Sequence, residues 1–273
     1  MTSIVCKIIS KCPVPLHDDP FMKYRLKMLG WHVFASTCLL FIIVGALYLG
    51  WYRWPGWYLA DMLTVLPIAV GVDVVIGPLL TFVIASPTKP RRMLARDIAV
   101  IVFIQLLALG YGCTTLWKGR PLYYAYSAKQ ITVVQAAQLT SEAITLAQQH
   151  NPEFAPHWYS LPRWVYATFP DDGKARAESM RAIVNGGSGV TSLPRYYQPW
   201  QNGLPELRTQ LLKIETSQFF SKKDKAVLEQ RLVALGFPAN AAVTMPFTGH
   251  GAPLLAVFDP QSLQIKALLS TKP

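Results

Sequence analysis

Apolar residues gather in three long stretches near the start of the chain, and the sequence after them alternates between polar and apolar positions. The stretches run over residues 29–52, 59–85 and 98–117. A helix needs about 20 apolar residues to cross the ~30 Å hydrocarbon core of a bilayer. Each stretch meets or nearly meets this length. The pattern therefore predicts a membrane domain of three transmembrane helices over residues 29–117.

The rest of the chain, residues 118–273, predicts a small α+β domain. The expected elements are one or two strands in Pro121–Val134, helices at Val134–Gln149, Asp172–Val184, Pro205–Lys213 and Ser221–Gly236, and a β-hairpin at Ala252–Ser270. The helix from Ser221 has the clearest start, because Asp224 three residues on imitates a capping box. The predicted fold class is a membrane α-helical anchor followed by a small α+β extracytoplasmic domain.

Basic residues flank the apolar stretches unevenly. The tail, residues 1–28, and the loop Ser86–Asp97 are rich in Lys and Arg, whereas the loop between the first two stretches holds only Arg53. Lys and Arg in short loops are retained on the cytoplasmic side of a membrane. We therefore expect a multi-pass membrane protein with a cytoplasmic N-terminal tail and a C-terminal domain on the outer side. If the source is a bacterium, the membrane is the bacterial inner membrane and the C-terminal domain is periplasmic.

The net charge of +11 does not alter the predicted membrane protein. Much of the excess lies in the tail and the inner loop, where membrane topology and attraction to anionic lipid account for it. No zinc spacing, phosphate-binding loop or catalytic motif accompanies the charge. We expect membrane lipids as a partner, and we expect no nucleic-acid partner, no cofactor, no metal site and no enzymatic activity.

Asp73 is the sharpest chemical feature of the second stretch. A carboxylate near mid-membrane costs at least ~2.5–3.5 kcal/mol on insertion scales, so it normally faces the bundle interior. Two interpretations stay open. Asp73 is a site for a proton, a cation or another transmembrane helix, or it is a protonated acid that bonds a neighbouring span, for example at Gln105. Gly77 permits close helix approach and Pro78 removes a backbone donor, so this helix is expected to be kinked.

Two segments of the second domain are aromatic, basic and rich in proline: Asn151–Pro170 and Pro194–Pro205. This composition is typical of a surface that binds another protein, and Tyr196 and Tyr197 are the candidate contacts. Covering the core of the domain itself is at least as good an interpretation.

A series of short motifs runs through the second and third stretches. It reads Asp73-Val-Val-Ile-Gly-Pro-Leu-Leu-Thr, Pro90-Arg-Arg, Arg96-Asp97, Ile104-Gln-Leu-Leu-Ala-Leu-Gly-Tyr-Gly and Gly119-Arg-Pro. The series resembles that of the type IV pilin accessory proteins, the TfpX/TfpZ group of inner-membrane proteins. The positions carried over as family signature are Asp73, Gly77, Pro78, Arg91, Arg92, Arg96, Asp97 and Gln105.

The resemblance implies a non-enzymatic, chaperone-like helper that promotes assembly of a cognate type IV major pilin, in contact with the pilus assembly machinery. A pilin held in and above the membrane would meet both domains at once, which favours avidity over a single tight interface. Two alternatives stay open: an oligomeric proton- or ion-conducting protein that uses Asp73, and a periplasmic sensor that acts through a partner. The oligomeric state is left open as well.

Overall fold

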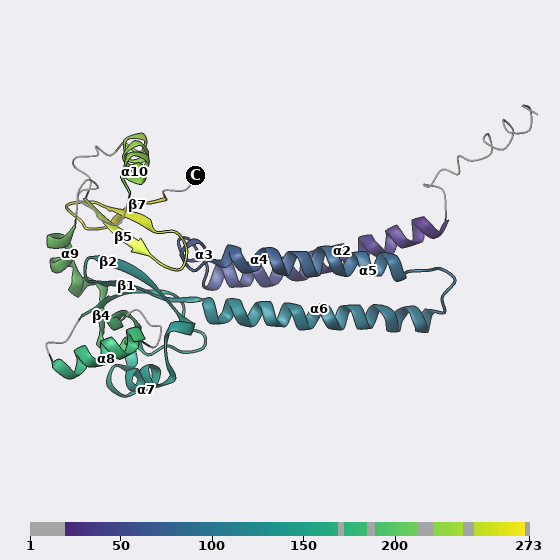
Figure 1. The fold of residues 1–273 in the computed structure, drawn as a ribbon, viewed down its shortest axis with the longest axis horizontal. Coiled ribbons are helices and arrows are strands. Elements are labelled where there is room, and N and C mark those ends of the chain that lie inside the picture. Colours follow the sequence, from purple (N-terminus) through teal and green to yellow (C-terminus); the bar gives the residue numbers. More distant parts are fainter. Residues whose placement is uncertain (1–19, 169–171, 185–188, 212–220, 237–242, 271–273) are drawn as a thin grey trace, which may run out of the picture. The chain divides into compact units, whose positions relative to one another are not determined.

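The computed structural model describes residues 20–168, 172–184, 189–211, 221–236 and 243–270 (Figure 1). Its contacts group into two compact units. One contains residues 1–45 and 66–113, and the other contains residues 46–65 and 114–273. The second unit therefore takes in the connection between the first two apolar stretches.

The first unit is built from long apolar helices that run alongside one another (Figure 1). These are α2 (Pro20–Gly50), a second helix made of α4 (Met62–Val70), the π-helical turn η1 (Gly71–Ile76) and α5 (Gly77–Ile84), and α6 (Arg91–Gly119). All three are long and apolar enough to cross a membrane. Only 11%, 17% and 22% of their most apolar windows are buried inside the protein. Such surfaces require lipid or another helix around them, which fits the expected membrane anchor.

The second unit contains a seven-stranded mixed sheet with the order β4-β3-β1-β2-β5-β6-β7. The strands are β1 (Pro121–Ser127), β2 (Gln130–Gln135), β3 (Arg163–Ala167), β4 (Tyr197–Pro199), β5 (Val243–Thr248), β6 (Leu254–Phe258) and β7 (Ile265–Ser270). β3 is parallel to β1 and β5 is parallel to β2, and the other neighbours are antiparallel.

Helices connect the strands of this sheet. They are α7 (Ser141–His150), α8 (Gly173–Val184), α9 (Leu204–Gln210) and α10 (Lys222–Ala234). Short 3-10 turns lie between them: η2 (Ala136–Gln138), η3 (Pro152–Phe154), η4 (Gly189–Ser192), η5 (Pro194–Tyr196) and η6 (Trp200–Gly203). The long apolar helices and the α+β composition of the second domain are as predicted, and the helices are consistent with the predicted anchor.

The period-two alternation of the strands distributes their side chains between two faces. On β1, Tyr124 and Tyr126 belong to one buried cluster with Phe247 of β5, while Tyr123 and Ala125 belong to a second cluster. A third cluster lies under α10, where Leu228 and Leu232 pack on β6 and β7, and it includes Leu255, Val257 and Leu269. The sheet is thus buried on both faces.

Residues 51–61, which we call the strap, join α2 to α4 and pack into the sheet. Leu59, at the end of α3 (Gly56–Leu59), is 0% exposed and belongs to the same cluster as Tyr124 and Phe247. The Gly251 N–H donates to the Leu59 carbonyl at 3.0 Å, and Gln135 Nε2 donates to the Ala60 carbonyl at 3.0 Å. The strap is therefore an internal part of the sheet unit.

Several elements differ from the sequence-based expectations. Leu59 lies in the sheet core and the second apolar helix begins at Met62. The helix expected over Val134–Gln149 begins only at Ser141, because Val134 is a β2 residue and the Thr140 side chain caps the helix by accepting from the Ala143 N–H. Strands β3, β4 and β5 were not expected.

Other expectations are confirmed. The Pro121–Val134 segment forms two strands, and the last hairpin forms β6 and β7. The α10 helix starts after Ser221, whose hydroxyl accepts from the Asp224 N–H at 3.2 Å. The end of the helix expected at Pro205–Lys213 lies outside the described residues.

Gly249→Ala tests the docking of the strap. A Cβ at this position would lie 2.3 Å from the Leu59 carbonyl oxygen, a backbone atom that cannot turn aside. We expect a loss of about 1–3 kcal/mol in unfolding free energy, as for other overpacked sites. The measurement is unfolding of the detergent-solubilised chain. Gly173→Ala, whose Cβ would meet nothing within 4 Å, is the matched control. Equal unfolding of the two variants would contradict the tight docking.

Candidate functional site

Polar side chains cluster in the first unit, where apolar composition makes them costly. Four of them come from three separate helices: His32 from α2, Asp73 and Thr81 from the second helix, and Gln105 from α6. Asp73, Thr81 and Gln105 are 5%, 2% and 8% exposed. Because polar groups in hydrocarbon are expensive unless paired, this cluster is the strongest candidate for a functional site.

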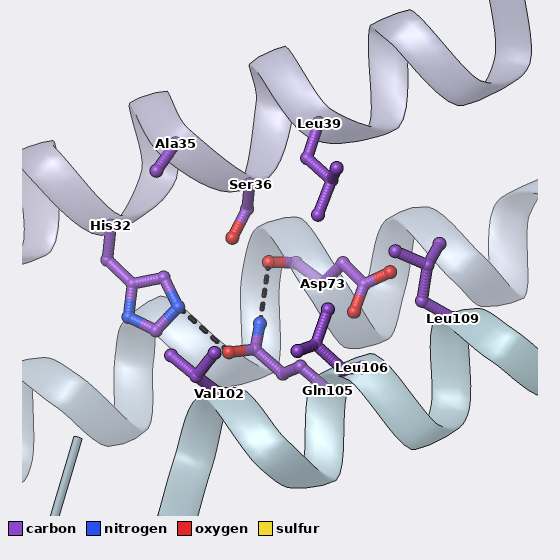
Figure 2. A pocket seen from close by; sticks show the side chains of 9 residues that line it. All are labelled: His32, Ala35, Ser36, Leu39, Asp73, Val102, Gln105, Leu106 and Leu109. Atoms are coloured by element: carbon purple, nitrogen blue, oxygen red, sulfur yellow. Dashed lines mark hydrogen bonds between the residues drawn. The ribbon is translucent and has the colours of Figure 1, made fainter. Parts of the chain in front are cut away.

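The irregular backbone at Asp73 explains why Gln105 is needed. In η1 the Gly77 N–H donates to the Val72 carbonyl, five residues back. With the same spacing, the Asp73 carbonyl would receive its bond from residue 78, but Pro78 has no N–H. Gln105 Nε2 donates to this carbonyl instead, at 3.1 Å (Figure 2). The side chain of α6 thus satisfies the backbone group that the π-helical turn and the proline leave without a donor.

The orientation of Gln105 in turn fixes His32. The Gln105 amide nitrogen is used on a carbonyl, so its Oε1 faces His32 Nε2 at 2.8 Å (Figure 2). Since Oε1 only accepts, Nε2 carries the donated hydrogen. In the neutral ring Nδ1 then accepts, and the Thr81 hydroxyl lies 2.5 Å from it. The cluster is one directional chain of hydrogen bonds from α5 through α2 and α6 to η1.

The Asp73 carboxylate takes no part in this chain. Among the residues that the structure describes, neither of its oxygens has a hydrogen-bond partner. It lies in a pocket of about 140 Å³ whose lining also includes His32, Ser36, Leu39 and Gln105. Figure 2 shows the carboxylate on the side of Leu109, away from the Gln105 amide. The expected pair of Asp73 and Gln105 therefore exists, but through the Asp73 carbonyl and not through its acid.

The glycine at position 77 makes this geometry possible. A Cβ on Gly77 would lie 2.0 Å from Gln105 Nε2, whereas a Cβ on Gly71 would meet nothing within 4 Å. Sequence reasoning identified Asp73, Gly77, Pro78 and Gln105. It missed His32 and Thr81, although a histidine inside an apolar stretch is itself a sign of a polar partner.

The remaining signature residues lie elsewhere. Arg91, Arg92 and Arg96 are exposed near the start of α6, and Asp97 pairs with Lys89 at 3.0 Å. Tyr197 is 3% exposed, its hydroxyl donates to the Thr191 carbonyl, and burial raises its pKa well above the usual value. Tyr196 is half-buried and donates to Glu178, which also pairs with Arg195. Tyr197 therefore supports the core, the alternative interpretation of its segment.

The sheet unit has a groove of about 710 Å³ that both aromatic segments line. Glu153, Arg163 and Trp164 come from the first segment, and Pro199, Trp200 and Gln201 come from the second. The rings of Trp164 and Trp200 pack edge to face at 5.1 Å. Residues from distant parts of the sequence thus form one aromatic groove, whose lining includes the Glu153 carboxylate and the Arg163 guanidinium.

Burial acts on the tyrosines of β1 in the sheet unit. Burial raises the pKa of Tyr123 and Tyr124 to about 12, so both phenols stay neutral. Tyr123 uses its hydroxyl to donate to the Phe154 carbonyl at 2.7 Å. No group of three or more His, Cys, Asp or Glu side chains suited to a metal ion occurs among the described residues.

Comparison with known proteins gives three relatives from Dichelobacter nodosus. The fimbrial assembly protein of serogroup I is 26% identical over 157 residues, which are 56% of this chain and 61% of that protein. The chain is similar to fimbrial assembly proteins. The serogroup E1 protein is 23% identical over 202 residues, 73% of this chain and 75% of its own length. The protein of serogroups C1 and C2 is 26% identical over 124 residues, 45% of this chain and 95% of its own length.

No protein-family model matches the chain, and no solved structure matches it significantly. The match with the serogroup I protein spans less than two thirds of that relative.

Gly77→Ala tests the polar chain. The added methyl would displace the Gln105 amide from the Asp73 carbonyl and from His32. We expect about 1–2 kcal/mol lower unfolding free energy in detergent, the size of hydrogen bonds between membrane helices. Gly71→Ala in the same π-helical turn is the control and should change little.

A double-mutant cycle with Gln105→Ala, which removes the atoms that the new methyl group would overlap, shows whether the effect passes through Gln105. If it does, Gly77→Ala adds little once Gln105 is replaced, because the methyl no longer displaces an amide. Additive losses would mean that Gly77 acts through another contact.

Proposed function

We propose that this protein is a type IV pilin accessory protein of the TfpX/TfpZ group, which holds a cognate major pilin and assists its assembly into pili. In this proposal it lies in the inner membrane, with the tail in the cytoplasm and the sheet unit in the periplasm. The similarity to fimbrial assembly proteins and the basic residues of the tail and the 86–97 loop support it.

The observation that carries the proposal is the unpaired Asp73 carboxylate in its pocket. A carboxyl group at this depth requires a partner, and the described residues supply none. A client helix that presents a hydrogen-bond donor or a positive charge would supply one. Leu39 and Leu106, which line the same pocket, are 40% and 51% exposed and offer apolar contacts beside the acid.

The groove of the sheet unit is the proposed contact for the globular part of the client. Its two tryptophans and adjacent charged groups have the composition of interface hot spots, in which aromatic residues and arginine dominate. Two moderate contacts on one client raise the effective concentration of each for the other. A helper that must later release its client benefits from this division, since neither contact alone needs to be tight.

In-cell photo-crosslinking tests the proposed surfaces. A benzophenone amino acid is placed at Leu39 in the pocket and at Gln201 in the groove, in cells that express the cognate pilin. Phe41 is the control for Leu39. It follows Leu39 by two residues on α2, about half a helical turn, and it is 78% exposed. Glu142, exposed on α7, is the control for Gln201.

Pilin adducts at Leu39 and Gln201 that exceed those at the controls are the expected result. Asp73→Asn should weaken the Leu39 adduct and lower piliation, because it removes the negative charge offered to the client. Asp61→Asn changes an exposed acid of the strap, and it should leave the Leu39 adduct and piliation unchanged. Equal adducts at Leu39 and Phe41 would overturn the pocket as the docking site.

Conduction by an oligomer is the rival function that the same carboxylate would serve. Purified protein in vesicles loaded with a pH-sensitive dye distinguishes the two. Proton flux that Asp73→Asn abolishes, together with unchanged pilin adducts, would replace the client-holding function with conduction.

A further inference from the structure

Three large apolar side chains are exposed next to one another in the sheet unit. Trp158, Tyr159 and Leu161 are 73%, 58% and 56% exposed. They lie in the segment between η3 and β3, far from the pocket of Asp73 in sequence. Large aromatic side chains on a protein surface mark contact with a protein or a membrane when they occur together.

This segment forms a turn with its own hydrogen bonds and ring contacts. The Ser160 N–H donates to the His157 carbonyl at 3.1 Å, and the His157 N–H donates to Ser160 Oγ at 2.8 Å. The His157 ring stacks on Tyr159 at 5.4 Å, and Trp158 meets Tyr159 edge to face at 5.5 Å. The exposed rings therefore belong to a defined local structure, which we call the aromatic turn, residues 157–161.

Two hydrogen bonds tie the aromatic turn to the ends of apolar helices. Trp51, the residue after α2, donates from Nε1 to the Ser160 carbonyl at 2.7 Å. Arg120, the residue after α6, donates from Nη2 to the Trp158 carbonyl at 3.4 Å. All these residues belong to the same compact unit. The turn is thus fixed within a side chain's length of the points where two apolar helices end.

Those helix ends have the tryptophan and arginine side chains that are typical of a membrane–water interface. The rings of Trp51 and Trp117 pack edge to face at 4.9 Å, and the Arg120 guanidinium lies 4.2 Å from the Trp117 ring centre. Trp and Tyr prefer the headgroup region on each side of the hydrocarbon, a layer about 5–8 Å thick. The aromatic turn is hydrogen-bonded to helix ends of this kind.

We propose that the aromatic turn is a lipid-binding element that inserts Trp158, Tyr159 and Leu161 into the interface of the bilayer in which the helices are embedded. Lipid is the occupant because the hydrogen bonds from Trp51 and Arg120 hold the turn at the depth of lipid headgroups. The turn adds a fourth attachment of the sheet unit to the membrane, beside the end of α2, the start of α4 and the end of α6. This proposal does not depend on the identity of any client.

Depth-dependent fluorescence quenching tests the proposal on the full chain. Its native cysteines are replaced, a single cysteine at position 158 or 161 is labelled with an environment-sensitive dye, and the protein is reconstituted into phosphatidylethanolamine–phosphatidylglycerol vesicles. Lipids with a nitroxide at the headgroup or deep in the acyl chain serve as quenchers. Val184, 84% exposed on α8, provides the matched label site.

We expect quenching at 158 and 161 that exceeds quenching at 184 by about twofold or more, with the shallow quencher stronger than the deep one, as for interfacial side chains. Trp51→Phe keeps an aromatic ring but removes the donor to the Ser160 carbonyl, and it should reduce quenching at 158. Three results would overturn the proposal. They are equal quenching at 158 and 184, quenching at 158 that Trp51→Phe leaves unchanged, and a blue-shifted dye that lipid nitroxides do not quench, which would assign the turn to a protein contact.

Discussion

The burial of Leu59 in the sheet core is the contact on which the organisation of this chain depends. The strap that contains it joins two apolar helices, yet its side chains pack with β-strands that follow much later in the sequence. Full burial of a leucine contributes about 1.5–3 kcal/mol. The hydrogen bonds to the Leu59 and Ala60 carbonyls add direction to this apolar contact. The strap, the end of α6 and the sheet consequently belong to one compact unit, and the hydrogen bond from Trp51 connects the aromatic turn to the same unit.

The polar chain in the first unit follows from a single backbone irregularity. A π-helical turn next to a proline leaves the Asp73 carbonyl without its own donor, and Gln105 crosses from α6 to supply one. The same amide then orients His32, so three helices share one set of hydrogen bonds. π-Helical turns inside α-helices often occur at functional sites. Here the turn also presents the Asp73 acid to a pocket while the rest of the cluster is internally satisfied.

The parts of the fold that local patterns govern were predictable. Long apolar runs identify α2 and α6, and the Ser221–Asp224 cap identifies α10. Strands β3 and β4 were not predictable in this way, because β3 pairs with β1 and β4 pairs with β3, and both pairings join segments that are distant in the sequence. The Leu59 side chain is apolar in either environment, so hydropathy alone assigned it to a membrane helix. In the site, Asp73 and Gln105 could be recognised from the sequence, because polar side chains are costly in a membrane helix. That Gln105 bonds the Asp73 carbonyl could not be predicted without the backbone geometry of η1.

The contact between the Tyr58 hydroxyl and Ser270 Oγ joins residues 212 positions apart in the sequence. This span has a consequence for the order of folding. The strap precedes every strand of the sheet in the sequence, and β5 and β6, which share its cluster with β1 and β2, follow most of the other elements. The cluster around Leu59 is therefore complete only after β5 and β6 have been synthesised. Closing so long a loop is slow, since its entropy is lost before any native contact compensates for it. The strap thus completes its contacts with the sheet unit only when β7 is in place.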